Sequence, residues 1–145
     1  MPVRDPHAGQ PVFGAGAAVE KATAAMVLLH GRGALAASIL ALAGEFQKAE
    51  IVQSVAFVAP QAAGSTWYPN SFLAPRASNE PWLGSALNRV ESVVESLVES
   101  GLSRERILVC GFSQGACLAT EFVASHPARY AGLIAFTGGL IGPLG

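Results

Sequence analysis

Residues Gly111-Phe112-Ser113-Gln114-Gly115 form the pattern G-x-S-x-G, in which a serine can act as a nucleophile. An apolar segment ends directly before the pattern and helix-forming residues begin directly after it, which places Ser113 at a strand-to-helix turn. The flanking glycines leave room for strand and helix to approach closely. The pattern is short enough to arise by chance, and the alternative is that Ser113 is an ordinary helix N-cap. Its context favours a hydroxyl exposed at the carboxyl edge of a sheet.

A second segment that could do chemistry is His30-Gly31-Arg32-Gly33, which follows another apolar run and precedes a helix-forming stretch. In serine hydrolases that carry G-x-S-x-G, a backbone N–H of such a loop joins the N–H of the residue after the nucleophile. Together the two donors stabilise the oxyanion that forms when the serine attacks a carbonyl. The expected donors are the main-chain nitrogens of Arg32 and Gln114. The alternative is a plain glycine turn.

The elements that must position these two segments alternate along the chain. Short apolar runs predict buried strands, and apolar residues spaced by three and four predict helices. The predicted strands cover 25–30, 54–59, 106–112 and 132–137, and the predicted helices cover 35–49, 83–100 and 114–125. This alternation predicts an α/β fold whose mostly parallel sheet has helices on both faces. The long loop over 61–81, rich in proline and aromatic residues, is typical of a functional loop.

Composition excludes several classes of protein. The 145 residues favour a single domain over 1–145, with a loose lead-in over 1–16 and a short antiparallel edge strand from residues near 12–13 and 17–19. A net charge of -1 gives no electrostatic footprint for nucleic acid. Two cysteines exclude a disulfide framework or a structural Cys-type zinc site. No apolar run is long enough for a membrane span and no signal peptide is evident, so a cytoplasmic protein is expected.

Four segments carry a resemblance to a known family. They are LLHGRGA, APQAAGSTWYPNSF, GFSQGACLA and TGGLIGP, in that order along the chain. Together they resemble the phospholipase/carboxylesterase branch of the α/β-hydrolases, a group that includes acyl-protein thioesterases. The likeness runs from about Ala25 to the end of the chain. It implies the α/β-hydrolase fold, and TGGLIGPLG stops where the family continues with two further strands, the acid, the base and a closing helix. The sequence is therefore expected to lack its last strands and helix.

The resemblance also implies roles for individual residues. Ser113 would be the nucleophile, with the amides of Arg32 and Gln114 as the oxyanion hole. Trp67, Tyr68 and Phe72 would border the substrate's acyl group. The residues expected to shape the site without reacting are His30, Gly31, Gly111 and Gly115. Arg32 stands where the family has an apolar residue, and its cation is expected to favour acidic or polar leaving groups. Neither a metal nor an organic cofactor is implied.

The catalytic triad is incomplete in this sequence. In this fold the acid and then the histidine follow the serine, but no Asp follows Ser113, and the single Asp of the chain is Asp5. His126 lies at the far end of the helix that Ser113 begins, ~20 Å away at 1.5 Å per residue. His7 is expected to be solvated in the lead-in. His30 is expected to fix its turn, with a role as base kept as an alternative.

These observations predict a serine hydrolase that cleaves small carboxylic esters or thioesters through an acyl-enzyme on Ser113. This chain alone is expected to be inactive, because it lacks a matching acid and histidine. Two alternatives stay open. The chain could be a non-catalytic ligand-binding α/β-hydrolase fragment, or a second chain could supply the base, which leaves a homodimer open. The expected partner is a small-molecule ester or thioester.

Overall fold

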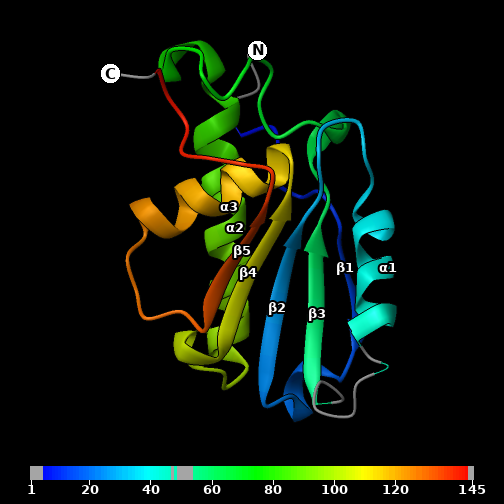
Figure 1. The fold of residues 1–145 in the computed structure, drawn as a ribbon. Coiled ribbons are helices and arrows are strands. Elements are labelled where there is room, and N and C mark those ends of the chain that lie inside the picture. Colours follow the sequence, from blue (N-terminus) through cyan, green and yellow to red (C-terminus); the bar gives the residue numbers. More distant parts are fainter. Residues whose placement is uncertain (1–4, 47, 49–53, 144–145) are drawn as a thin grey trace.

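The computed structural model describes residues 5–46, 48 and 54–143. Their strands form one sheet in the order β1-β3-β2-β4-β5 (Figure 1). β1 pairs antiparallel with β3, and the remaining neighbours pair in parallel. The strands are β1 (Val12–Gly16), β2 (Ala24–Leu29), β3 (Val55–Pro60), β4 (Ile107–Phe112) and β5 (Gly132–Phe136). The predicted α/β class and mostly parallel sheet are thus confirmed.

The register of the parallel strands determines which loops meet. Leu29 at the end of β2 lies opposite Gly111 near the end of β4, and Phe112 lies opposite Phe136 of β5. Because parallel strands end at the same edge of a sheet, the segments that follow β2, β4 and β5 gather there. That edge therefore carries both the G-x-S-x-G pattern of residues 111–115 and the glycine-containing loop of residues 30–33.

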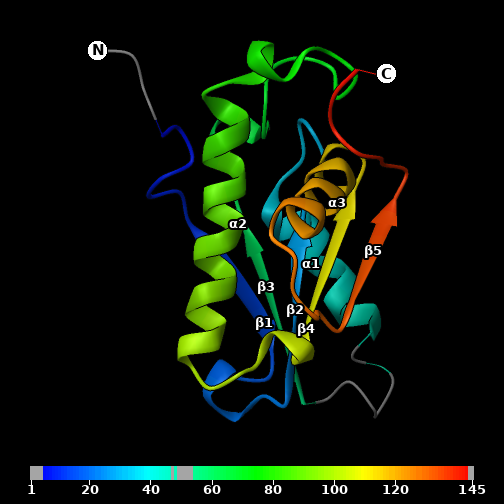
Figure 2. The same cartoon turned by 90° about the vertical axis from the view of Figure 1, so that its left-hand side faces the viewer.

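Helices cover both faces of the sheet (Figures 1 and 2). They are α1 (Ala36–Phe46), α2 (Trp82–Glu99) and α3 (Gln114–Ser125). Successive residues of β2 point to opposite faces: Val27 belongs to the core beneath α2 and α3, whereas Leu28 belongs to the core beneath α1. This two-sided burial explains why the strands read as continuous apolar runs. Among the helices of the described residues, none combines the length and hydropathy needed to cross a membrane.

The predicted elements are present, with small shifts at their ends. The predicted helix over 35–49 ends at Phe46 in the structure, and its expected end at Ala49 lies outside the described residues. The antiparallel edge strand is confirmed, but it continues only to Gly16. Residues 17–19 do not extend it because the chain turns into a short 3-10 helix at Val19–Lys21.

Within the predicted lead-in, the expectation that His7 is solvated is wrong, because this residue is completely buried. Its Nε2 donates to the carbonyl oxygen of Trp67 at 2.8 Å, and its Nδ1 accepts the N–H of Ala63 at 3.0 Å. The main-chain N–H of His7 donates to the Ser85 hydroxyl at 3.0 Å. The proline and glycine content of this segment predicted a solvated histidine. The prediction failed because composition does not show which distant residues a segment contacts. Residues 1–4 of the predicted lead-in lie outside the described residues.

The two buried histidines predict a dependence of stability on pH. Burial lowers the pKa of both His7 and His30 below the usual value of 6.5. Below about pH 6.5 the unfolded chain therefore binds protons that the folded rings do not, and the free energy of unfolding should fall. Each ring contributes a slope of at most about 1.4 kcal/mol per pH unit. Urea unfolding between pH 8 and pH 5 measures this slope.

A non-titrating variant identifies the contribution of one ring. We expect His7→Gln to be less stable than the original chain at pH 8, but to lose less of its remaining stability between pH 6.5 and pH 5. The control Asn88→Gln, at an exposed and non-titrating residue of α2, keeps both buried rings and should retain the original slope. Equal slopes in His7→Gln and the original chain would exclude His7 as a source of the pH dependence.

Candidate active site

Ser113 is the residue that joins β4 to α3, and it is exposed. Its backbone has φ 56° and ψ -116°, a conformation that a residue with a side chain rarely adopts. Strain of this kind persists only where surrounding contacts enforce it, and it is typical of functional turns. One such contact is the hydrogen bond from the Ser113 N–H to the carbonyl oxygen of Phe136, at 2.9 Å. The bend thus presents the hydroxyl at the carboxyl edge of the sheet.

The two glycines of the motif allow the bend to be this tight. A Cβ on Gly111 would lie 2.2 Å from the carbonyl oxygen of Gly115. A Cβ on Gly115 would lie 2.0 Å from the carbonyl oxygen of Leu29, at the end of β2. Both distances are well below van der Waals contact. The start of α3 therefore lies directly on the main chain of β2 and β4, which leaves no room for side chains at these positions.

The loop after β2 lies against Ser113. A Cβ on Gly31 would lie 3.3 Å from the carbonyl oxygen of Phe112 and 3.5 Å from the Cβ of Ser113. Among the hydrogen bonds of the described residues, none is donated by the main-chain N–H of Arg32 or of Gln114. Gln114 is the first residue of α3, where a helix leaves its N–H groups without internal acceptors. Neither amide therefore has an acceptor among the described residues.

The Gln114 side chain anchors the start of α3 to the loop after β3. Its Oε1 accepts the main-chain N–H of Trp67 at 2.8 Å, and its Nε2 donates to the carbonyl oxygen of Tyr68 at 2.8 Å. The residue is 6% exposed, so these bonds form in a largely dry environment. A buried amide with both ends satisfied fixes the position of the helix terminus that follows Ser113.

None of the histidines of the described chain is placed to act on Ser113. The His30 Nδ1 donates to the carbonyl oxygen of Gly31 at 2.8 Å, and its Nε2 accepts the N–H of Ala62 at 3.0 Å. Both ring nitrogens are therefore occupied, and neither can accept the serine proton. His126 caps the other end of α3, where its Nδ1 lies 3.3 Å from the carbonyl oxygen of Phe122. A helix of this length separates it from Ser113 by roughly 20 Å.

The aromatic residues of the 61–81 loop differ from the expectation that they border the substrate. Trp67 and Tyr68 are 0% and 1% exposed and belong to the core beneath α2 and α3. The Trp67 Nε1 donates to the carbonyl oxygen of His30 at 2.9 Å. These two side chains thus anchor the loop to the core, where they pack between the sheet and the helices. Only Phe72, which is half-buried, keeps surface that a substrate could contact.

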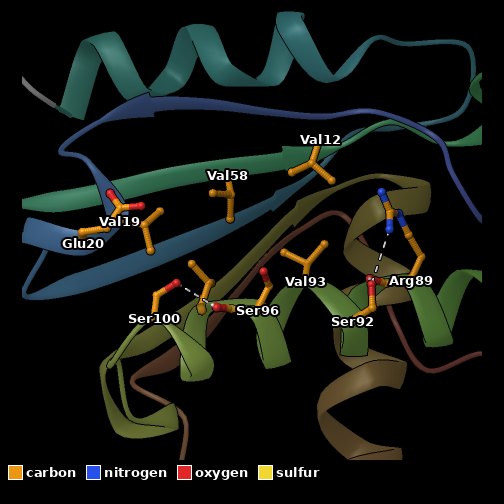
Figure 3. A pocket seen from close by; sticks show the side chains of 10 residues that line it. Val12, Val19, Glu20, Val58, Arg89, Ser92, Val93, Ser96 and Ser100 are labelled. Atoms are coloured by element: carbon orange, nitrogen blue, oxygen red, sulfur yellow. Dashed lines mark hydrogen bonds between the residues drawn. The ribbon is translucent and has the colours of Figure 1, made fainter.

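Two cavities are relevant to the site. One of about 210 Å³ shares Gly31 and Phe112 with the surroundings of Ser113, and its far wall is apolar. A larger one, about 450 Å³, lies between α2 and the β1 edge, with Arg89 and Glu20 at opposite ends (Figure 3). The larger cavity has none of the residues of the serine motif in its walls. We therefore place the candidate site at the smaller cavity, because its walls include Gly31 and Phe112, which lie beside Ser113.

Sequence reasoning did not identify Glu121, a carboxylate on the buried side of α3 that is 8% exposed. It forms an ion pair with Arg76 of the 61–81 loop, and it accepts the N–H of Ile141 at 3.3 Å. The glutamate therefore fastens the loop and the segment after β5 to the helix behind Ser113. A charged residue among the apolar positions of α3 was the available signal. Within the described residues, no cluster of His, Cys, Asp and Glu side chains could hold a metal ion.

The chain is similar to several known proteins. The family model described as phospholipase/carboxylesterase matches residues 15–144. Acyl-protein thioesterase 1 of Eremothecium gossypii is 30% identical over 84% of this chain, and acyl-protein thioesterase 1 of Yarrowia lipolytica is 26% identical over 80%. The chain spans 57% of the length of each of these curated relatives. The crystal structure of a phospholipase/carboxylesterase from Dyadobacter fermentans is 45% identical, with a TM-score of 0.85, over 92% of this chain and 62% of that one.

Proposed function

The chain belongs to the phospholipase/carboxylesterase family and has the α/β-hydrolase fold, and from this membership we propose that Ser113 is the nucleophile of a serine hydrolase. The substrates are small carboxylic esters or thioesters, and the proposed location is the cytoplasm. The observation that carries the proposal is the strained, exposed Ser113 with Gly31 packed against its Cβ. This arrangement brings a hydroxyl and unoccupied amide donors to one sheet edge.

The chemistry follows from these positions. The Ser113 Oγ attacks the carbonyl carbon and forms a new C–O bond, while its proton passes to a histidine base. The former carbonyl oxygen becomes an oxyanion that accepts the N–H groups of Arg32 and Gln114, each worth about 3 kcal/mol in the transition state. The bond to the alcohol or thiol then breaks, and the histidine returns the proton to that leaving group. Water releases the acyl group by the same steps in reverse order.

The proposal assigns the base and its orienting acid to residues outside this chain. His30 has both nitrogens bonded, and His126 caps the far end of α3. Further residues of the protein supply both groups, or a second copy in a homodimer supplies the base. Activity that rises more than in proportion to protein concentration would indicate the second source.

A fluorophosphonate probe tests the proposal directly, because it labels a serine only when a base and an oxyanion hole activate it. The probe is added to this 145-residue chain and, separately, to the product of the whole reading frame that encodes it. We expect the whole product to be labelled at Ser113 within minutes and to hydrolyse p-nitrophenyl butyrate. Peptide mapping locates the label, and Ser113→Ala is the control. Labelling at another serine would overturn the assignment.

The occupied ring of His30 favours one alternative, a fold that binds an ester without cleaving it. In that case the free Arg32 and Gln114 amides and the cavity of about 210 Å³ hold the ligand. p-Nitrophenyl butyrate should then raise the unfolding temperature of the whole product without release of nitrophenol. Rapid hydrolysis that depends on Ser113 excludes this alternative.

A further inference from the structure

The Arg32 side chain binds the main chain of the loop after β3. Its Nη1 donates to the carbonyl oxygen of Pro69 at 3.0 Å, and its Nη2 donates to those of Tyr68 and Asn70 at 3.1 and 2.8 Å. The guanidinium carbon also lies 5.9 Å from the centre of the Tyr68 ring, within range of a cation–π contact. A planar group with donors in a fixed fork is suited to bind several oxygens at once. One arginine thus connects the loop after β2 to three consecutive carbonyls.

The same loop holds the second amide of the proposed oxyanion hole. The carbonyl oxygen of Tyr68 accepts a hydrogen bond from the Gln114 side chain as well as from Arg32. Behind these bonds, the Gly33 N–H donates to the carbonyl oxygen of Ser65 at 2.7 Å. Arg32 and Gln114, which are far apart in the sequence, therefore both bind one segment, residues 65–70. The side chains of Arg32 and Gln114 are thus linked through the carbonyl oxygen of Tyr68.

We propose that Arg32 is a positioning residue: its side chain, by binding the carbonyls of Tyr68, Pro69 and Asn70, holds its own amide in register with the amide of Gln114. The inference rests on the proposed function, in which both amides bind the oxyanion. A donor must lie within ~0.5 Å of its productive place, and an error near 1 Å can cost ~100-fold in rate. A loop with glycine on both sides of Arg32 does not supply this rigidity by itself.

This role differs from the one expected from sequence, in which the cation selects acidic or polar leaving groups. A cation that binds the substrate would lower KM for anionic esters, and a lysine at this position would preserve much of that decrease in KM. A positioning guanidinium acts on the transition state, so its loss lowers kcat for neutral esters and leaves KM nearly unchanged. Lysine cannot fully replace it, because its donors lie on one nitrogen, whereas the arginine fork reaches the carbonyls with two separate nitrogens, Nη1 and Nη2.

The experiment compares Arg32→Met and Arg32→Lys with the original protein, all as the product of the whole reading frame. Hydrolysis of neutral p-nitrophenyl butyrate gives kcat and KM. Hydrogen exchange measured by mass spectrometry on peptides covering 30–35 and 62–72 reports how firmly the two loops are held. Arg104→Met is the control, because Arg104 binds Glu91 and Glu95 on the surface of α2.

We expect both Arg32 variants to lose ~10- to 100-fold in kcat with KM changed less than ~3-fold, and both peptides to exchange faster. Arg104→Met should match the original protein in kcat and in exchange of these peptides. Unchanged exchange in Arg32→Met overturns the positioning role whether or not the protein is active. Unchanged kcat in both variants of an active protein also overturns it, as does full rescue by lysine. Failure of the proposed function is recognised separately, as absence of hydrolysis and of Ser113 labelling in the unsubstituted protein.

Discussion

Replacing Gly115 with alanine is expected to lower the free energy of unfolding by at least about 3 kcal/mol, which lies at or above the upper end of the usual range for overpacking. The added Cβ would lie 2.0 Å from the carbonyl oxygen of Leu29 and 2.5 Å from that of His30. Neither atom belongs to a flexible side chain, so relief requires α3 to move away from β2. For a domain of this size the unfolding temperature should drop by ~10 °C or more.

A second glycine gives the matched control for that prediction. Gly44 lies on the exposed side of α1, and a Cβ there meets no atom within 4 Å. Gly44→Ala should therefore raise the free energy of unfolding by about 0.5–1 kcal/mol, because alanine loses less backbone entropy in a helix. Thermal unfolding followed by circular dichroism measures both variants. Gly115→Ala as stable as the original chain would mean that strand and helix are not in contact at this bend.

The architecture and the placement of the serine were predictable because they depend on local patterns. Continuous apolar runs identified β2 and β4, and the helix-forming segment that follows β4 identified α3. Parallel pairing then required the strand ends to meet at one edge. The G-x-S-x-G pattern carries its own geometry, since a glycine at 111 and at 115 is needed by any chain that turns this sharply. Local sequence therefore contained both the fold class and the position of Ser113.

The parts that were not predictable depend on contacts between distant residues. His7 follows two prolines and looked solvated, yet its ring nitrogens bond to the loop after β3. Trp67 looked like a substrate contact, but a large aromatic ring is also what a core beneath two helices needs. The Arg32 side chain looked like a cation facing the substrate, and it binds carbonyls 36 to 38 positions away. The position of each of these three side chains depends on contacts with residues distant in the sequence, which a local pattern does not predict.

Removal of the Ser113 hydroxyl is expected to have the largest effect on activity. In serine hydrolases the loss of the nucleophile lowers kcat by ~10³- to 10⁶-fold, since the base then has no proton to take and no acyl-enzyme forms. Ser113→Ala and Ser113→Gly, each made in the product of the whole reading frame, should both hydrolyse p-nitrophenyl butyrate with kcat lowered by this factor. A rate within ~10-fold of the original in either variant would mean that another group attacks the ester.

The same pair of variants should differ in stability, because only one of them relieves the backbone. At φ 56° and ψ -116° an alanine keeps the Cβ that makes this conformation unfavourable, whereas a glycine removes it. The glycine relieves about 1–3 kcal/mol of backbone strain, and its extra freedom in the unfolded chain costs about 0.5–1 kcal/mol. We therefore expect the free energy of unfolding of Ser113→Gly to exceed that of Ser113→Ala by about 1 kcal/mol. That difference corresponds to ~4 °C in unfolding temperature for a domain of this size. If the alanine variant were instead the more stable of the two, the bend would store no strain, and the serine would occupy it at no cost to the fold.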